Sequence, residues 1–364
     1  MPDLFMPLSV GGTELRNRVM VSPMCQYCCE TDGLATEWHH VHLGSRAVGG
    51  AGLVMSEAAA VTPAGRITPY DLGVWSDEHS EALARTAAFV ADHGAVPGIQ
   101  LAHAGRKASR EPPRNGRGPV EDDRAWTPVG PTAEPYPAEE TVPTERLDRE
   151  GIADLIEAFR DAAARASAAG FEVAEVHGAH GYLLHEFLSP VTNTREDGYG
   201  GGFEGRTRLV REVCAAVREA FDGAVFLRLS ATDWLPDRES WTVADTARLA
   251  ERVADAGTVD LVDVSAGGLR PDQQVPDARP HYQVPYAERV TEALAGEDCA
   301  VGAVGKITTP EGADEIVSNG RADLAILARE HLRDPYFTLH AASALDAGDR
   351  VDPPTQYHRG FPDL

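Results

Sequence analysis

The segment Phe171-Glu-Val-Ala-Glu-Val-His-Gly-Ala-His-Gly-Tyr182 shows how this chain is built. Its first half is a short apolar run, which is typical of a buried strand. Its second half places the imidazoles of His177 and His180 and the phenol of Tyr182 directly after that strand. Two hydrogen-bond donors can hold one carbonyl oxygen, and a nearby tyrosine can supply a proton. The segment therefore predicts a strand that carries reactive groups at its C-terminal end.

Short β-rich runs alternate with longer amphipathic runs on both sides of this segment. The apparent strands cover residues 18–22, 52–57, 96–102, 173–177, 224–229, 261–265, 300–304 and 324–328. The helical patterns cover residues 38–48, 77–93, 148–169, 203–221, 243–256, 284–294, 309–319 and 335–347. This alternation predicts an α/β fold with a parallel sheet, and a single closed (β/α)8 TIM barrel fits the 364 residues.

An open doubly wound sheet is the alternative fold. Such a sheet usually carries a glycine-rich phosphate turn after its first strand, whereas the first strand here ends in Ser22-Pro-Met-Cys25. Residues 8–15 read as an N-terminal hairpin that could close the barrel floor. Residues 109–147 have no period and read as a long loop after the third strand. We expect residues 1–364 to form one barrel domain.

The charge balance is that of a soluble acidic protein. The chain has 57 acidic and 33 basic residues and a formal net charge of -24, and its only lysines are Lys107 and Lys306. Nucleic acid is not an expected partner, because phosphate binding needs a basic patch. We interpret the charge as halophilic adaptation, since high salt screens repulsion between carboxylates. We expect a cytoplasmic protein without a membrane partner, because no apolar run suits a membrane helix or a signal peptide.

Five cysteines stand at positions 25, 28, 29, 214 and 299. Cys25, Cys28 and Cys29 resemble part of a metal cluster, but no fourth ligand follows at a suitable spacing. We therefore expect neither a metal site nor a disulfide framework.

Polar side chains recur where the predicted strands end. In a TIM barrel the reacting groups gather at these ends, so we expect the side chains to meet. Gln100 and Arg228 can hydrogen-bond the polar edge of a flat heterocycle, and the late glycines that open onto helices suit a phosphate group. The strand ends contribute Cys25, Tyr27, Glu57, Ala58, Gln100, His103, Arg106, Lys107, His177, His180, Tyr182, Arg228, Ser265, Gly305, Lys306, Ala328 and Arg329.

Seven segments, in a fixed order across about residues 4–361, carry a family resemblance. They are Leu15-Arg-Asn-Arg-Val19, Ser22-Pro-Met-Cys25, Gly98-Ile-Gln-Leu-Ala-His-Ala-Gly-Arg-Lys107, His177 through Pro190, Gly302-Ala-Val-Gly305, Asn319-Gly-Arg-Ala-Asp-Leu324 and Arg333-Asp-Pro335. In these segments the chain resembles the Old Yellow Enzyme family of FMN-dependent ene-reductases. It is most similar to the subclass found in thermophiles and Gram-positive bacteria.

The resemblance implies a role for each matching position. The flavin would be contacted by Ser22, Pro23, Met24, Cys25, Ala58, Gln100 and Arg228, and its phosphate by Gly305, Lys306, Ala328 and Arg329. His177 and His180 would hold the substrate's carbonyl oxygen. Tyr182 would donate a proton, and Tyr27 would line the substrate pocket. Arg359, in the ending Gln356-Tyr-His-Arg-Gly-Phe361, would reach the active site of a neighbouring subunit. The implied assembly is a homodimer or homotetramer, with the tail at about residues 350–364 near the interface.

The implied reaction is that of an NADPH dehydrogenase of the Old Yellow Enzyme type. NADPH or NADH reduces FMN, and hydride then passes from flavin N5 to the β-carbon of an activated alkene such as an enone, enal, maleimide or nitroalkene. The chain departs from the family at two phosphate positions. Ala328 stands where glycine is usual, and Lys306 stands where an apolar residue is common.

The residues by themselves leave two other functions open. His177 and His180 could be metal ligands and Lys306 could form an imine, as in a lyase built on the same barrel. A flavin-binding sensor without ene-reductase turnover is the second alternative. Metal analysis with borohydride trapping would detect the lyase, and the response to enones would separate an enzyme from a sensor.

Overall fold

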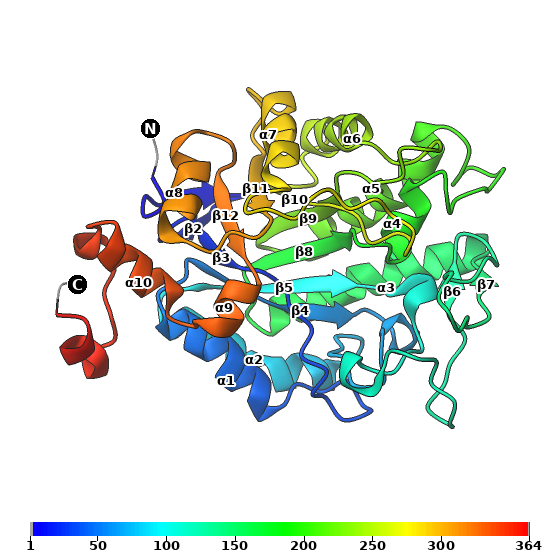
Figure 1. Cartoon of the computed structure of the whole chain (residues 1–364). Coiled ribbons are helices and arrows are strands. Elements are labelled where there is room, and N and C mark those ends of the chain that lie inside the picture. The colour runs from blue at the N-terminus through cyan, green and yellow to red at the C-terminus, as the bar shows by residue number, and fades with distance from the viewer. Residues whose placement is uncertain (1–2, 363) are drawn as a thin grey trace.

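Eight parallel strands close into a barrel in the computed structural model, which describes residues 3–362 and 364 (Figure 1). The strand order around the barrel is β10-β11-β12-β3-β4-β5-β8-β9. The TIM-barrel prediction is confirmed, and the open sheet is excluded. The strands are β3 (Val19–Val21), β4 (Leu53–Ala60), β5 (Val96–Ala102), β8 (Val173–Gly178), β9 (Ala224–Ser230), β10 (Leu261–Ser265), β11 (Ala300–Val304) and β12 (Leu324–Leu327).

Helices pack around the outside of the barrel (Figure 1). They are α1 (Glu37–Val48), α2 (Asp77–Asp92), α3 (Arg149–Ala168), α4 (Leu183–Leu188), α5 (Phe203–Ala220), α6 (Val243–Asp255), α7 (Val284–Ala293), α8 (Pro310–Ser318), α9 (Arg329–Arg333) and α10 (Phe337–Ala344). The eight predicted helices are present and differ from the prediction by a few residues at their ends. Helices α4 and α9 were not predicted, because segments of six and five residues are too short to show a helical period.

The strands are apolar because both of their faces are buried. Every residue of β4, β5, β8, β9 and β10 is buried. Side chains that point outward, such as Ile99 and Val225, pack against the helices in the largest core cluster. Side chains that point inward near the strand starts, such as Leu53 and Phe226, form a second cluster inside the barrel. A parallel sheet covered on both faces needs this near-continuous apolar pattern.

The predicted hairpin closes the floor of the barrel. Strands β1 (Leu8–Val10) and β2 (Thr13–Leu15) pair antiparallel around Gly11 and Gly12, which both have positive φ. Val10 and Leu15 belong to the inner core cluster that is formed by the starts of the barrel strands. The opposite end of the barrel, where the strands terminate, is therefore the end that is open for a site.

The long loop after β5 lies at this open end. It contains the two-residue strands β6 (Val129–Gly130) and β7 (Glu145–Arg146) together with a 3-10 turn at Pro113–Asn115. In Figure 1 the loop lies at the side toward which the β5 arrow points, and the C-terminal segment lies beside α10 at the other side of the molecule. In the described part of the chain, none of the helices has the length and apolar character needed to span a bilayer.

Candidate active site

His177, His180 and Tyr182 come together directly after β8. The ring centroid of His177 lies 5.1 Å from that of His180 and 5.2 Å from that of Tyr182, and both pairs meet edge to face. The backbone turns sharply here, because His180 has a φ of 60° and Gly181 a φ of 70°. The His180 N–H donates to the hydroxyl of Ser230 on β9 at 2.9 Å, which holds this turn in place. The three groups predicted from one sequence motif therefore face one another.

Both imidazoles are neutral at physiological pH. Burial first, and the positive charge of Arg228 second, lower the pKa of His177 and of His180 well below the ordinary histidine value. His180 Nε2 lies 2.8 Å from the hydroxyl oxygen of Ser265. His177 Nδ1 is buried and has no hydrogen-bond partner among residues 3–362 and 364. A buried polar atom without a partner is unusual, and it marks a position where a ligand can bind.

Tyr182 is a protonated phenol in this environment. Burial raises its pKa well above the ordinary tyrosine value. The ammonium group of Lys107 lies 5.3 Å from the centroid of the Tyr182 ring, within cation–π range. Lys107 is held there because its Nζ donates to the backbone carbonyl of His180 at 2.7 Å and to that of Gly268. Tyr182 can therefore donate a proton beside a fixed positive charge.

A polar network fills the barrel interior below these groups. Gln100 Nε2 donates to Glu175 Oε1 at 2.7 Å. Arg228 forms an ion pair with Asp263 at 3.1 Å, and its Nη1 donates to the Ser22 hydroxyl at 3.2 Å. Burial is the largest cause that raises the pKa of Glu175 and of Asp263. Like charges in contact cannot both ionise in a buried site, so this pair shares a proton.

The sequence analysis did not identify Glu175 and Asp263 as part of the site. The signal was present, because each is an acidic residue inside an otherwise apolar strand. Acidic side chains are almost never fully buried unless they are paired. In the structure they fix the orientation of Gln100 and Arg228, the two residues predicted to contact a flat heterocycle.

A cavity of about 320 Å³ lies at the ends of β11 and β12. The predicted phosphate residues Gly305, Lys306, Ala328 and Arg329 all line it. Gly305 and Lys306 have positive φ, so the backbone turns tightly at the end of β11. Arg329 is the first residue of α9 and stands beside this turn. The Lys306 ammonium donates to the Ala278 carbonyl, so in this structure a backbone group already holds it.

A second cavity, of about 400 Å³, lies between Tyr182 and the long loop. Tyr27, the predicted substrate-pocket residue, lines it together with Tyr182 and Lys107. Arg110, Arg117 and Tyr136 come into this cavity from the loop, and the sequence analysis did not single them out. Their segment has no period and no motif, so only the folded chain shows which of its side chains face the site. A smaller cavity beside Tyr182 is lined by Ala58 and Asp71.

The segment Ser22–Cys25 continues from β3 across the barrel end. Pro23, Met24 and Cys25 are partly exposed, whereas Ser22 is buried. Burial is the largest effect that raises the pKa of the Cys25 thiol well above its ordinary value. Cys25 is therefore a protonated thiol and is not activated as a nucleophile.

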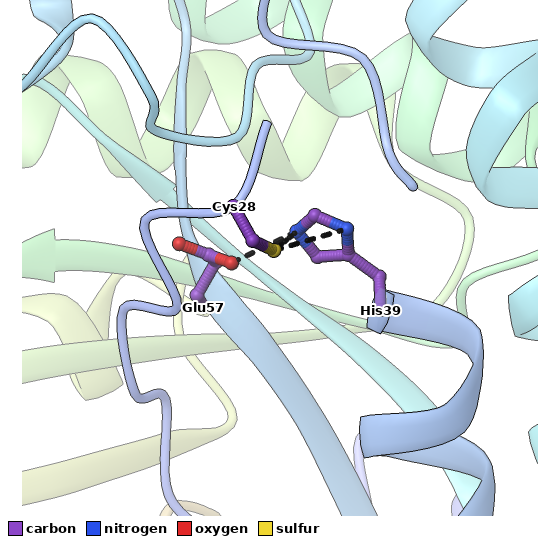
Figure 2. Close-up of side chains that lie close together, drawn as sticks. All are labelled: Cys28, His39 and Glu57. Atoms are coloured by element: carbon purple, nitrogen blue, oxygen red, sulfur yellow. Dashed lines mark hydrogen bonds and ion pairs between the residues drawn. The ribbon is translucent and has the colours of Figure 1, made fainter. Parts of the chain in front are cut away.

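Cys28 meets two residues from other elements, His39 on α1 and Glu57 on β4 (Figure 2). Their ligand-type atoms lie within 4.8 Å of one another, although the cysteine spacing alone did not suggest further ligands. The Thr36 N–H donates to His39 Nδ1 at 2.9 Å, so the ring proton is on Nε2, which donates to Glu57 Oε1 at 2.9 Å. Glu57 Oε2 accepts from the Gln26 N–H at 3.0 Å. These hydrogen bonds occupy both ring nitrogens of His39 and both carboxylate oxygens of Glu57, and we propose no metal there.

Arg359 does not line any of the cavities described above. It is an exposed residue in the C-terminal 3-10 segment Thr355–Gly360.

The strand-end groups and the two cavities agree with the comparisons to known proteins. Residues 3–347 match the model of the NADH:flavin oxidoreductase / NADH oxidase family. The chain belongs to this family. It is 45% identical over 359 residues to an NADPH dehydrogenase of Geobacillus sp. (strain WCH70), with 98% of both chains covered. It is also 45% identical over 359 residues to an NADPH dehydrogenase of Geobacillus thermodenitrificans (strain NG80-2), again with 98% of both chains covered.

Among solved structures, the fold is similar to that of morphinone reductase in complex with tetrahydroNAD. The TM-score is 0.78 and the identity is 26%, covering 97% of this chain and 93% of the other. Membership of the NADH:flavin oxidoreductase family makes this chain an NAD(P)H-dependent oxidoreductase with FMN and NAD(P)H as its cofactors.

The observed site fits FMN. The polar network of Gln100 and Arg228 offers donors to the edge of a flat ring, and the cavity at Gly305 and Arg329 suits a phosphate. His177, near the C-terminal end of β8, keeps its Nδ1 without a hydrogen-bond partner among the described residues, and a bound molecule can supply one.

Proposed function

We propose that this protein is an FMN-dependent ene-reductase that reduces activated alkenes such as enones, enals, maleimides and nitroalkenes. The single observation that carries the proposal is the grouping of two neutral imidazoles with one protonated phenol. When bound and reduced by NAD(P)H, FMN supplies the hydride that the β-carbon of the alkene receives. The side chains of this protein then have two tasks, which are to stabilise the negative charge and to deliver a proton.

His177 and His180 hold the activating oxygen of the alkene. Charge develops on this oxygen as hydride arrives at the β-carbon, so each N–H donor binds the enolate more strongly than the ketone. A neutral imidazole can donate from only one nitrogen. Removal of one such donor costs about 2.7–4 kcal/mol of transition-state stabilisation in comparable sites.

Ser265 decides which nitrogen of His180 carries the proton. If the Ser265 hydroxyl donates to Nε2, the ring proton is on Nδ1 and is free for the substrate oxygen. The Ser265 oxygen lies 2.8 Å from Nε2 and 3.2 Å from Gln283 Oε1, so its single proton has two acceptors, and we propose that it goes to the nearer one, Nε2. We therefore assign Ser265 as a positioning residue that sets the tautomer of His180.

Tyr182 delivers the proton to the α-carbon. Its raised pKa keeps the phenol protonated through the neutral pH range. The Lys107 ammonium at 5.3 Å from its ring stabilises the negative charge that develops on the phenol oxygen as the proton leaves. The phenol oxygen then takes up a new proton from solvent through the adjoining cavity, which Tyr182 lines.

The remaining predicted residues are assigned to cofactor and substrate binding. We propose that Ser22, Pro23, Met24, Cys25, Ala58, Gln100 and Arg228 hold the flavin ring and that Gly305, Lys306, Ala328 and Arg329 hold its phosphate. The extra methyl group of Ala328 leaves its backbone N–H available as a donor. The Cys25 thiol is polarizable and can tune the reduction potential of a bound flavin. Tyr27 lines the substrate side of the site.

We further propose that the protein works as a homodimer or homotetramer. Arg359 is exposed in the C-terminal segment and is not among the residues that line the three cavities described above. In an assembly it would enter the substrate pocket of the neighbouring subunit. Equilibrium sedimentation of the wild type and of a chain that ends at residue 349 tests this assignment. A monomeric wild type with full activity would contradict it.

The proposed function is tested with the purified holoenzyme. We expect a flavin absorbance spectrum that bleaches anaerobically on addition of NADPH or NADH and returns on addition of 2-cyclohexenone. The cyclohexanone product is measured by gas chromatography. A yellow protein that oxidises NADPH only with oxygen would favour the sensor alternative. Bound metal, or inactivation by borohydride in the presence of a carbonyl substrate, would favour the lyase.

A further inference from the structure

The cavity beside Tyr182 is lined by three basic side chains. Lys107 follows β5, and Arg110 and Arg117 come from the long loop after it. The cavity has a volume of about 400 Å³, which leaves room for a substituent beyond the reacting part of a small alkene. Glu111 is the only acidic residue among the described residues that line it.

Two of the three basic side chains have a carboxylate nearby, Glu186 for Lys107 and Glu140 for Arg110, but none of the three is held in a salt bridge among the described residues. Three acidic side chains nearby are each paired with a different arginine, whereas Asp71, beside Tyr182, accepts from the Thr68 hydroxyl at 2.6 Å. Glu111 pairs with Arg124 at 3.0 Å, Glu186 with Arg106 at 3.7 Å and Asp272 with Arg270 at 2.8 Å.

This positive cavity is unexpected on such an acidic chain. The protein has a formal net charge of -24, whereas the lining of this cavity holds three basic side chains and one acidic side chain. One of the two lysines of the whole sequence, Lys107, is among the three. A cleft lined by one sign of charge focuses the field and attracts ligands of the opposite sign.

Two of the charges are built into the structure. Lys107 is fixed by the carbonyls of His180 and Gly268 and lies 4.9 Å from the centroid of the Tyr136 ring. Arg110 is only 7% exposed, and its Nη1 donates to the Glu140 carbonyl at 2.7 Å. Its Nη2 is buried without a hydrogen-bond partner among the described residues. A buried guanidinium nitrogen without a partner is costly unless a ligand supplies one.

We propose that this cavity binds an anionic group, a carboxylate or a phosphate, carried by the molecule whose reacting end lies beside Tyr182. The inference rests on the proposed ene-reductase function, and it adds the class of substrate or coenzyme that the site selects. The anion can come from a carboxylated alkene or from the 2′-phosphate of NADPH. Both would be held by Lys107, Arg110 and Arg117, because charge-assisted hydrogen bonds to these groups are the strong ones.

The alkene source is tested with a matched pair of substrates. 4-Oxocyclohex-2-ene-1-carboxylate and its methyl ester have the same reacting enone, but only the acid is charged at neutral pH. We expect the ratio of kcat/KM for the acid to that for the ester to exceed about tenfold, which corresponds to one charge-assisted hydrogen bond. The ratio should fall as KCl is added, because salt screens the partly exposed charges.

The coenzyme source is tested in the other half-reaction. Stopped-flow reduction of the flavin by NADPH and by NADH gives an apparent Kd for each coenzyme. If the cavity binds the 2′-phosphate, the Kd for NADPH is about tenfold lower than that for NADH. The same two measurements are then repeated with Arg110→Gln and with Arg117→Gln. Arg117 is exposed on the loop, so its variant should fold even if the buried Arg110 variant does not.

A variant at the outer surface is the control for net charge. Arg289→Gln removes one positive charge from the exposed side of α7, away from the cavity. The two ratios are kcat/KM for the acid over that for the ester, and Kd for NADH over that for NADPH. The proposal holds if either ratio exceeds about tenfold in the wild type, falls by about threefold or more in the Arg117 variant, and stays at the wild-type value in the Arg289 variant. It is overturned if both ratios are near one, or if the Arg289 variant lowers them equally.

Binding without turnover separates this inference from the proposed function. Calorimetry of the holoenzyme with 4-oxocyclohexane-1-carboxylate and with its methyl ester measures the same preference on saturated compounds. Tighter binding of the acid, lost in Arg117→Gln, supports the anionic cavity even if the enone is not reduced. Rapid reduction of the enone ester with no preference for either acid supports the ene-reductase alone and rejects the cavity.

Discussion

The Nε2 atom of His180, which follows β8, lies 2.8 Å from the hydroxyl oxygen of Ser265, the last residue of β10. The same hydroxyl lies 3.2 Å from Oε1 of Gln283. A serine hydroxyl has one proton, so the choice between these two acceptors decides the tautomer of His180. The imidazole of His180 is thus in contact with a strand that lies two positions away in the barrel.

Replacement of Ser265 by alanine should weaken the clamp on the substrate oxygen. Without the hydroxyl, His180 is free to carry its proton on Nε2, where it does not point at the oxygen. We expect kcat/KM for 2-cyclohexenone to fall about fivefold to tenfold, the value of one neutral hydrogen bond. Ser265→Thr keeps the hydroxyl and should restore most of the activity. Equal losses in the alanine and threonine variants would show that Ser265 acts only through packing.

Replacement of Tyr182 by phenylalanine should slow the step that reduces the alkene. The variant lacks the phenolic proton, and a positioned general acid contributes about 10²–10⁴-fold. Stopped-flow measurement of flavin reoxidation by 2-cyclohexenone should show this loss. Tyr199→Phe is the matched control, because Tyr199 bonds Glu212 outside the site at 2.9 Å. Reoxidation at the wild-type rate in Tyr182→Phe would rule out this residue as the proton donor.

Removal of the Cys25 thiol should change the midpoint potential of the flavin. The thiol belongs to the segment proposed to line the flavin, and a nearby polarizable group affects the oxidised and reduced forms differently. Spectroelectrochemical titration of Cys25→Ala measures the shift. Cys299→Ala, at the residue that precedes β11 at the floor end of the barrel, is the control. An unchanged potential and an unchanged rate of reduction by NADPH would remove the tuning role.

The stability of the protein should fall as the pH drops from 6.5 toward 4. Burial lowers the pKa of His103 and of His331 from 6.5 to about 4. Between these values the unfolded chain binds a proton at each histidine and the folded chain does not, so acid favours unfolding. Each such histidine contributes up to about 1.4 kcal/mol per pH unit in this window.

Urea unfolding with saturating FMN at a series of pH values measures this dependence. His331→Gln should reduce the slope of unfolding free energy against pH below 6.5, because one of the buried titrating groups is gone. His358→Gln, in the exposed C-terminal segment, should leave the slope as it is. A slope that His331→Gln does not change would mean that other groups control acid unfolding.

The melting temperature should rise with salt. The formal net charge of -24 makes carboxylates repel one another across the surface, and KCl screens this repulsion. We expect a higher Tm in molar KCl than in dilute buffer, measured by scanning calorimetry with FMN in excess. Choline chloride at equal ionic strength is the control for specific binding of potassium. A Tm that is the same from dilute buffer to molar KCl would remove the halophilic interpretation.

Most of the barrel was predictable from the sequence because its signals are local. The apolar runs at Val96–Ala102, Leu261–Ser265 and Ala300–Val304 coincide with strands β5, β10 and β11. A strand buried on both faces has to be apolar along its whole length, so its pattern can be read without the partners. His177, His180 and Tyr182 were predictable for the same reason, since one turn of chain places all three.

The rest depended on contacts between distant segments. Ser265 meets His180 across 85 residues, and Gln100 meets Glu175 across 75 residues. Arg110 and Arg117 enter the cavity from a loop whose course no local pattern predicts. By itself, the sequence determined the barrel and the motif after β8, because hydrophobic period and turn chemistry act over a few residues. Only the tertiary structure decided which hydrogen-bond partners, charges and cavity surround that motif. These depend on where closure of the barrel brings side chains that are remote in the sequence.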